Sequence, residues 1–226
     1  DGYRDVLAGA PRLSRQHAHQ GAAFVFCGSA TGFAPPPAWE FLGDTAEAKV
    51  GAALSGGGDV NGDGFGDILI GGGQITTTQP HDGKAWLFLG SRAGLKGKPD
   101  WTAHGSRAYS RLGDRLALVG DVNGDGFGDT AVGAPGVDRE RSTVGQVFVY
   151  FGSRQGLSEQ PAWVLTGESV DAGFGSCVAS AGDVNGDGLA DLLVSAPGYK
   201  SGGGISGRVY LYLGQTNGSA PAPVMM

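Results

Sequence analysis

The sequence predicts an all-β fold, a β-propeller whose blades are four-stranded antiparallel sheets. The hexapeptide Asp-Val-Asn-Gly-Asp-Gly occurs three times, and its copies start 62 residues apart at Asp59, Asp121 and Asp183. The same period relates Trp39, Trp101 and Trp163, and also Gly28, Gly90, Gly152 and Gly214. Each period holds four short apolar runs separated by turn residues, and no stretch of helical length has helical periodicity.

The four strands of a unit, named A to D in chain order, are clearest in the third unit. Strand A is expected over 112–119, where apolar residues lead up to the Gly-Asp that opens the hexapeptide. Strand B at 129–135 is apolar and closes with a proline, which a strand tolerates at its end. Strand C at 146–152 is rich in β-branched and aromatic residues. A shorter strand D spans 161–167.

These units predict one domain over 1–226, a partial ring of about three and a half to four blades. The first blade is expected to be partial because it lacks strand A, and the last because it holds only the start of strand D. The chain is therefore expected to be a fragment of a longer array, with an open β-solenoid as the alternative fold. The predicted blades are 1–43, 50–105, 112–167 and 174–226.

Composition narrows the possible functions. Glycine accounts for 44 of 226 residues, but at fixed repeat positions, which favours tight turns over disorder. No apolar run reaches the roughly 20 residues that span a bilayer, and scattered Lys and Arg argue against nucleic-acid binding. Cys27 and Cys177 occupy different repeat positions, and we expect both to be buried small apolar residues without a disulfide.

The repeated loop has the residue types of a calcium site. Positions 1, 3, 5 and 9 carry carboxylates or an amide, position 6 is glycine, and position 7 can offer its main-chain oxygen, which suits a hard cation. A metal-free turn is the alternative, because Asn-Gly and Asp-Gly also favour hairpins, but clustered carboxylates repel without a cation. The expected ligands are Asp59, Asn61, Asp63, Phe65 and Asp67; Asp121, Asn123, Asp125, Phe127 and Asp129; and Asp183, Asn185, Asp187, Leu189 and Asp191.

We therefore expect about three Ca²⁺ ions, whose charge would balance the formal net charge of −6. The loop differs from an EF-hand because position 12 is apolar, as at Ile70, so no bidentate glutamate is present. The first residues, with Asp1 and Asp5, match only the second half of a loop, so low occupancy is expected there.

Phe174-Gly175, the loop from Gly182, and Ser195-Ala196-Pro197 resemble the FG-GAP repeats of the integrin α-chain β-propeller. This resemblance covers essentially the whole chain and implies seven-bladed rings with Ca²⁺ between strands A and B, in an extracellular or cell-surface setting. Related repeats occur in secreted bacterial proteins and a fungal lectin. The second unit departs from the motif, with Val50-Gly51 in place of FG and 71–73 reading Gly-Gly-Gly in place of GAP.

The units also differ among themselves in an orderly way. The A-to-B and C-to-D turns are nearly constant, whereas the B-to-C and D-to-A loops vary although their lengths are equal. Antiparallel strands place the constant turns on one face of a blade and the variable loops on the other, where specificity tends to reside. Drift of exposed loops is the alternative. The candidate binding residues are Tyr109, Arg111, Arg139, Arg141, Tyr199 and Lys200.

The function expected is a calcium-stabilised extracellular adhesion module that binds a protein or cell-surface ligand through its variable loops. A carbohydrate-binding lectin is the alternative, although it would need aromatic platforms in each blade. Ser14, His17 and His19 form no triad pattern, so an enzyme is not expected, and a transition-metal role for the histidines is disfavoured. We expect the tryptophans to pack between blades. The open ends suggest a homodimer that completes a ring.

Overall fold

The computed structural model describes residues 2–33, 35–136, 144–201 and 204–225. They form antiparallel sheets, each made of strands from one repeat unit. The secondary-structure elements of the described residues are all strands. The predicted all-β propeller architecture is confirmed. The candidates Arg139 and Arg141, and Asp1, lie outside the described residues.

Blade 1 is a three-stranded sheet and blades 2, 3 and 4 are four-stranded sheets. Blade 1 contains β1 (Val6–Gly9), β2 (Ala22–Phe26) and β3 (Trp39–Leu42). Blade 2 contains β4 (Ala53–Gly58), β5 (Asp67–Gly72), β6 (Lys84–Phe88) and β7 (Trp101–His104). Blade 3 contains β8 (Arg115–Gly120), β9 (Asp129–Ala134), β10 (Gln146–Tyr150) and β11 (Trp163–Thr166).

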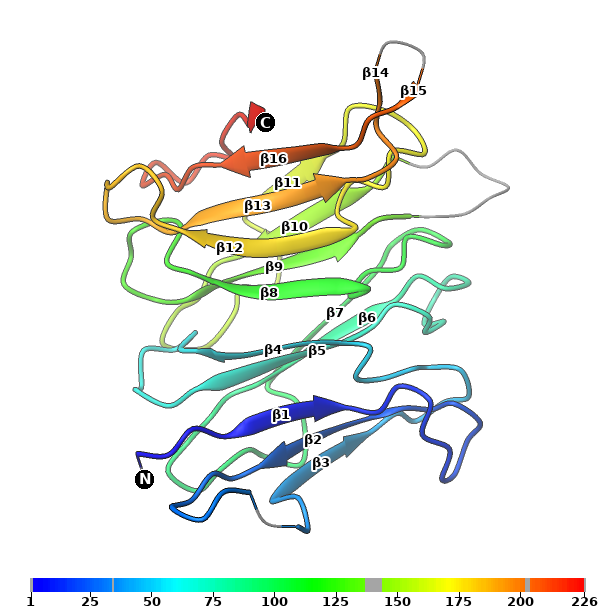
Figure 1. Cartoon of the computed structure of the whole chain (residues 1–226), viewed down its shortest axis with the longest axis vertical. Coiled ribbons are helices and arrows are strands. Elements are labelled where there is room, and N and C mark those ends of the chain that lie inside the picture. Colours follow the sequence, from blue (N-terminus) through cyan, green and yellow to red (C-terminus); the bar gives the residue numbers. More distant parts are fainter. Residues whose placement is uncertain (1, 34, 137–143, 202–203, 226) are drawn as a thin grey trace.

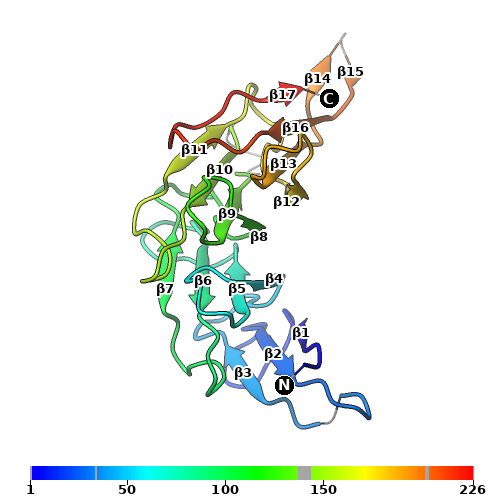
Figure 2. The same cartoon turned by 90° about the vertical axis from the view of Figure 1, so that its left-hand side faces the viewer.

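Blade 4 contains β12 (Cys177–Gly182), β13 (Asp191–Ala196), β16 (Arg208–Tyr212) and β17 (Val224–Met225). Its B-to-C loop carries an additional hairpin of β14 (Lys200–Ser201) and β15 (Gly204–Ile205). The blades stack side by side (Figure 1) along a curved arc, with β4, β8 and β12 on its concave side and β7 and β11 on its convex side (Figure 2).

The core lies between blades, because the sheets of blades 2 and 3 are covered on both faces by their neighbours. Strands β5 and β9 are buried at every residue, which explains their continuous apolar sequence. Alternate side chains of a strand point to opposite faces, so blades 2 and 3 each contribute one set of residues to the joint before them and another to the joint after them. Three apolar clusters fill the three joints.

The glycine of the GAP position permits the close approach of blades. A Cβ on Gly133 would lie 2.5 Å from the carbonyl oxygen of Gly175 in the next blade, and a Cβ on Gly71 would lie 2.0 Å from that of Gly113. Any side chain there would force the blades apart. The FG and GAP glycines of successive units are therefore matched across each joint.

The tryptophans pack between blades, as expected. Trp101 lies edge-on to Tyr150 of the following blade, with ring centroids 4.7 Å apart, and its indole Nε1 donates to the Ser158 carbonyl at 3.0 Å. Trp39 donates to Lys96 O at 2.8 Å and Trp163 to Gly218 O at 3.1 Å. Each tryptophan thus fastens its blade to the C-to-D turn of the next.

Two expectations about local structure were wrong. Cys27 and Cys177 are free, but both are exposed. Cys27 comes just after β2 ends, and Cys177 pairs with Ser195 on the face of blade 4 that no further blade covers. Strand A also starts three residues later than predicted, at Arg115 and Cys177, because the preceding glycines have positive φ and turn the chain.

Candidate functional site

The three repeated loops connect strands A and B at one edge of the blades, on the left of Figure 1. In each, the ladder register shifts just before the loop, between Gly56 and Gly58, Leu118 and Gly120, or Ser180 and Gly182. Such a bulge ends the pairing and redirects the chain. The loop therefore leaves the sheet at the same angle in every blade.

Within a loop, the side chains of positions 1, 3 and 5 are held close together by hydrogen bonds. In blade 2, Asp59 accepts from the main-chain N–H groups of Asp63 and Gly64 at 3.1 and 2.9 Å. The Asn61 amide donates to Asp63 Oδ2 at 3.0 Å, and Asp63 Oδ1 accepts from Phe65 N at 2.9 Å. The corresponding bonds recur in blades 3 and 4.

Position 9 has a second role that the sequence did not reveal. The Asp67 carboxylate is fully buried and accepts from Val60 N at 2.7 Å and Gly90 N at 2.8 Å. Asp129 and Asp191 repeat this pattern, with distances of 2.8–2.9 Å. Each of these aspartates ties its A-to-B loop to the C-to-D turn of the same blade.

Burial and, to a smaller extent, neighbouring negative charge disfavour ionisation of Asp67 and Asp129. Desolvation, with smaller contributions from Asp121 and Asp125, raises the pKa of Asp129 to about 7, although two N–H donors oppose the change. The same causes raise the pKa of Asp67 to about 6. The carboxylates of positions 1 and 5 therefore lie close enough to position 9 to be felt electrostatically.

The residues present fit a hard cation in donor type. Each loop brings together oxygens of two aspartates and an asparagine, with position 9 behind them, and such oxygens are what Ca²⁺ prefers. Among the residues that the structure describes, however, no three His, Cys, Asp or Glu side chains form a group that could hold a metal. In this structure the side chains of positions 1, 3 and 5 lie close together, whereas the carboxylate of position 9 accepts hydrogen bonds from main-chain N–H groups.

Neighbouring loops also contact one another through position 7. A Cβ on Gly62 would meet the Phe127 ring at 3.0 Å, and one on Gly124 would meet Leu189 at 3.0 Å. Both glycines also have positive φ. The Asn-Gly pair therefore provides both the turn and the space for the next blade's side chain. In the incomplete first loop, Asp5 still accepts from Gly28 N at 2.9 Å.

The variable loops lie at the opposite edge of the blades, on the right of Figure 1, and are joined in pairs. At the joint of blades 1 and 2, Glu47 N donates to Ala18 O at 2.8 Å and Lys49 N to His19 O at 3.1 Å. At the next joint, Tyr109 N donates to Pro80 O at 2.7 Å and Arg111 N to His81 O at 3.1 Å. In blades 1 and 2, the B-to-C loop is thus tied to the D-to-A loop that follows it.

Backbone strain is concentrated on this edge. Within the described ranges, seven residues other than glycine have positive φ, and all seven belong to B-to-C or D-to-A loops. This conformation is uncommon for residues with a Cβ and persists only where surrounding contacts enforce it. All seven are exposed or half-exposed. They are His19, Glu47, Lys49, His81, Tyr109, Arg111 and Asp171.

The candidate binding residues fall at two joints. Tyr109 and Arg111 lie at the joint of blades 2 and 3, where His81 packs on the Tyr109 ring. Tyr199 lies at the joint of blades 3 and 4, under the Arg208 guanidinium at 3.7 Å, and Lys200 begins β14.

The histidines of the first loop are not brought together as a catalytic or metal-binding pair. Ser14 Oγ accepts from the main-chain N–H of His19. The His19 ring instead contacts Glu47 Oε1 at 2.7 Å.

Two residues that shape the variable loops were missed. Gln20 is buried and its Oε1 accepts from three successive main-chain N–H groups, of residues 15–17. Asp82, one period later, is also buried and accepts from the N–H groups of residues 77–79. Their shared repeat position and polar type, just before strand C, was the available signal.

The chain is similar in sequence to known proteins over most of its length. The FG-GAP repeat model matches residues 113–150 and 174–212, which hold strands A to C of blades 3 and 4. The chain is 37% identical over 172 residues to human phosphatidylinositol-glycan-specific phospholipase D, covering 72% of this chain and 20% of that protein.

Among the described residues, no helix has the length and apolar character needed to cross a bilayer.

Integrin alpha chains are similar over comparable spans. Xenopus laevis integrin alpha-4 is 29% identical over 200 residues, covering 87% of this chain and 18% of that protein. Gallus gallus integrin alpha-8 is 34% identical over 149 residues, covering 62% and 14%. The chain spans about a fifth or less of the length of these relatives. With its matched repeats, its blades and its paired glycines, the chain belongs to the FG-GAP repeat family.

Proposed function

We propose that this chain is a calcium-stabilised, non-catalytic recognition module that acts outside the cell and binds a protein or cell-surface ligand through its variable loops. The observation that carries this proposal is the confinement of every strained non-glycine residue of the described chain to that edge. Strain of this kind clusters at working surfaces and persists where surrounding contacts enforce it.

Calcium would serve the opposite edge. Asp59, Asn61 and Asp63 and their repeats would hold one ion in each loop, with Asp67 and its repeats behind them. The ion would neutralise neighbouring carboxylates, whose charges add a smaller contribution to the burial that raises the pKa of Asp129. Ligands on the loop that ties strands A and B to the C-to-D turn would couple ion binding to blade stability.

A lectin is less well supported by the loops. Sugar rings are usually held on aromatic faces with polar neighbours. Of the two aromatic candidates, Tyr109 packs with His81 and Tyr199 lies against Arg208.

An enzymatic function is not part of this proposal. The similarity to a phospholipase covers a fifth of that enzyme, so we assign no catalytic role to this chain.

The test is saturable binding of the labelled chain to cultured animal cells, measured by flow cytometry with calcium present. We expect Tyr109→Ala and Lys200→Ala to weaken binding, and Arg92→Ala, on the constant edge, to leave it unchanged. A parallel glycan array examines the lectin alternative. Equal binding by all variants, or no saturable binding, would reject the assignment of the variable loops.

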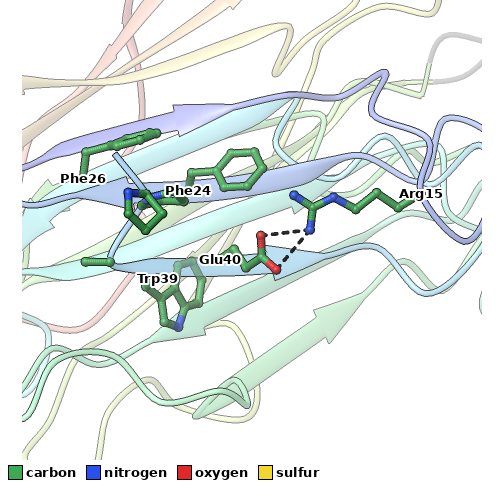
Figure 3. Close-up of a pocket in the computed structure, with 8 residues that line it drawn as sticks. Arg15, Phe24, Phe26, Trp39 and Glu40 are labelled. Carbon is green, nitrogen blue, oxygen red and sulfur yellow. Dashed lines mark hydrogen bonds and ion pairs between the residues drawn. The ribbon is translucent and has the colours of Figure 1, made fainter. Parts of the chain in front are cut away.

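We also propose that an isolated copy pairs with a second copy through its open blade faces. The uncovered face of blade 1 has a hollow of about 490 Å³ lined by Phe24, Phe26 and neighbouring residues, with Arg15 and Glu40 paired at its edge (Figure 3). The corresponding face of blade 2 is covered by Trp39 and Phe41 of blade 1.

The far face of blade 4 supplies the complementary surface. Leu193, Val209 and Leu211 occupy the repeat positions of Leu7, Ala23 and Val25, which cover blade 2 from blade 1. Val209 is 39% exposed, and Leu193 and Leu211 are half-buried. A head-to-tail pair would therefore repeat a joint that the chain already makes, and a second such contact could close the ring.

A further inference from the structure

The joint of blades 2 and 3 differs from its neighbours in a coordinated set of positions. Position 73 is glycine where the other units have proline, and position 114 is aspartate where they have alanine or serine. A Cβ on Gly73 would lie 2.0 Å from Asp114 Oδ1. The Gly73 departure from the GAP motif therefore makes room for the Asp114 carboxylate.

Asp114 in turn anchors an arginine. Arg111 Nη2 lies 2.6 Å from Asp114 Oδ2, and the two side chains are 28% and 14% exposed. With the Gln74 amide oxygen facing the arginine, that oxygen accepts from Arg111 Nε at 3.1 Å and Nη2 at 2.8 Å. Arg111 also has positive φ, 57°. The Arg111 guanidinium thus contacts the side chains of Asp114 and Gln74, while part of it remains exposed to solvent.

The surroundings of this arginine are cationic. Burial raises the pKa of Asp114, and the charges of Arg111, Arg115 and Lys49 oppose that change, so all three lie near the same carboxylate. Lys49 also pairs with Glu47 at 3.5 Å. Arg107, on the same loop as Arg111, donates to the uncharged Gln146. Three cations therefore lie near Asp114, which is largely buried, and Glu47 pairs with one of them.

We propose that this junction, centred on Arg111, binds a carboxylate side chain on an acidic segment of a partner protein. The proposal rests on the recognition role proposed for the variable loops and names the chemistry of the partner. An anchored guanidinium is suited to a planar carboxylate because its fork is already oriented. The His81 and Tyr109 rings, whose centroids are 5.5 Å apart, offer a flat wall on the same loops for the stem of that side chain.

The probe is a phage-displayed library of random peptides, selected on the immobilised full chain in calcium-containing buffer. We expect enriched peptides to be rich in Asp and Glu and to be released by added salt. A synthetic peptide from that pool should bind Arg111→Gln roughly tenfold to a hundredfold more weakly. It should bind Arg154→Gln, the same change of charge on the constant edge, as well as the original chain.

Two further variants guard against a folding defect, because Arg111→Gln leaves Asp114 buried without its partner. The double variant Arg111→Gln with Asp114→Asn removes both charges, and Lys49→Gln changes only an exposed cation. We expect both to retain the melting temperature of the original chain within a few degrees and to lose peptide affinity, the lysine variant by several-fold.

The outcomes separate this inference from the wider proposal. Enriched peptides without acidic residues, or acidic peptides that bind these variants normally, would overturn the inference, while cell binding would still judge the recognition role. If no peptides are enriched and Arg111→Gln is retained on heparin more weakly than the original chain, the ligand is a sulfated glycan and the proposed protein segment is rejected. If no peptides are enriched and retention on heparin is unchanged, the proposed protein segment is rejected as well.

Discussion

Truncation of Trp163 tests whether the tryptophans hold the blades together. Trp163 is 1% exposed, lies edge-on to Phe151 at 5.3 Å and donates to Gly218 O of blade 4. Replacing a buried tryptophan by alanine costs about 3–5 kcal/mol, and we expect Trp163→Ala to fall in that range. Trp101 makes the corresponding hydrogen bond, to Ser158 O, and packs edge-on to Tyr150 of the next blade. It is only half-buried, so Trp101→Ala should cost less.

The comparison of Trp163→Phe with Trp163→Ala separates the ring from its hydrogen bond. Phenylalanine keeps most of the apolar contact but leaves the Gly218 carbonyl without its donor, at a cost of about 1–3 kcal/mol. The assay is urea unfolding in calcium-containing buffer, followed by circular dichroism and by hydrogen exchange. A cost for Trp163→Ala below about 1 kcal/mol, or below that of Trp101→Ala, would refute the joint model. If a tryptophan variant instead lost ligand binding while its free energy of unfolding stayed unchanged, the lectin alternative would be favoured.

Three further predictions follow from other parts of the chain. Chelation should lower the melting temperature markedly, and Asp63→Ala, Asp125→Ala and Asp187→Ala should each remove about one equivalent of bound Ca²⁺; an unchanged melt would reject the structural ion. Although burial opposes ionisation of Asp82, hydrogen bonds from Thr77, Gln79 and Thr78 lower its pKa from 3.8 to about 2. Its ionised form therefore stabilises the fold above about pH 4, and this stability should be lost as pH falls toward 2; Asp82→Asn should flatten that acid limb, and an unchanged acid limb would reject this role of Asp82. Light scattering should give about twice 22.8 kDa for the chain and the monomer mass for Phe24→Asp; a monomeric original chain would exclude pairing.

The fold could be predicted because its determinants are local and repeated. The hexapeptide, the strand patterns and the tryptophans each recur every 62 residues. A chance resemblance to a strand in one unit can therefore be recognised, because the other units do not share it. The starts of strand A were misplaced because Gly113 and Gly175 turn the chain by adopting positive φ, which an apolar pattern cannot reveal. The exposure of Cys177 was missed because it depends on a neighbouring blade and not on its own strand.

The loops could be predicted in composition but not in geometry. Their residue types indicated calcium, yet the main-chain bonds of Asp67 involve Gly90, which lies 23 positions away. In the same way, Gln20 and Asp82 appear unremarkable in sequence, and only the folded loops show three N–H groups converging on each. Such roles depend on the direction of backbone donors, which no side-chain pattern encodes.

The two edges of the blades together explain why the loop sequences vary on one edge and are nearly constant on the other. On the constant edge, Asp67, Asp129 and Asp191 join both turns of their blades through main-chain donors, and position 7 joins each loop to the loop before it. That edge can change little without disturbing every blade. On the variable edge, main-chain bonds such as that from Arg111 N to His81 O hold the loops, and these bonds do not depend on the side chains. Loop sequences can therefore change while their backbone remains fixed, as the substitution of Lys49 by Arg111 one period later already shows within this chain.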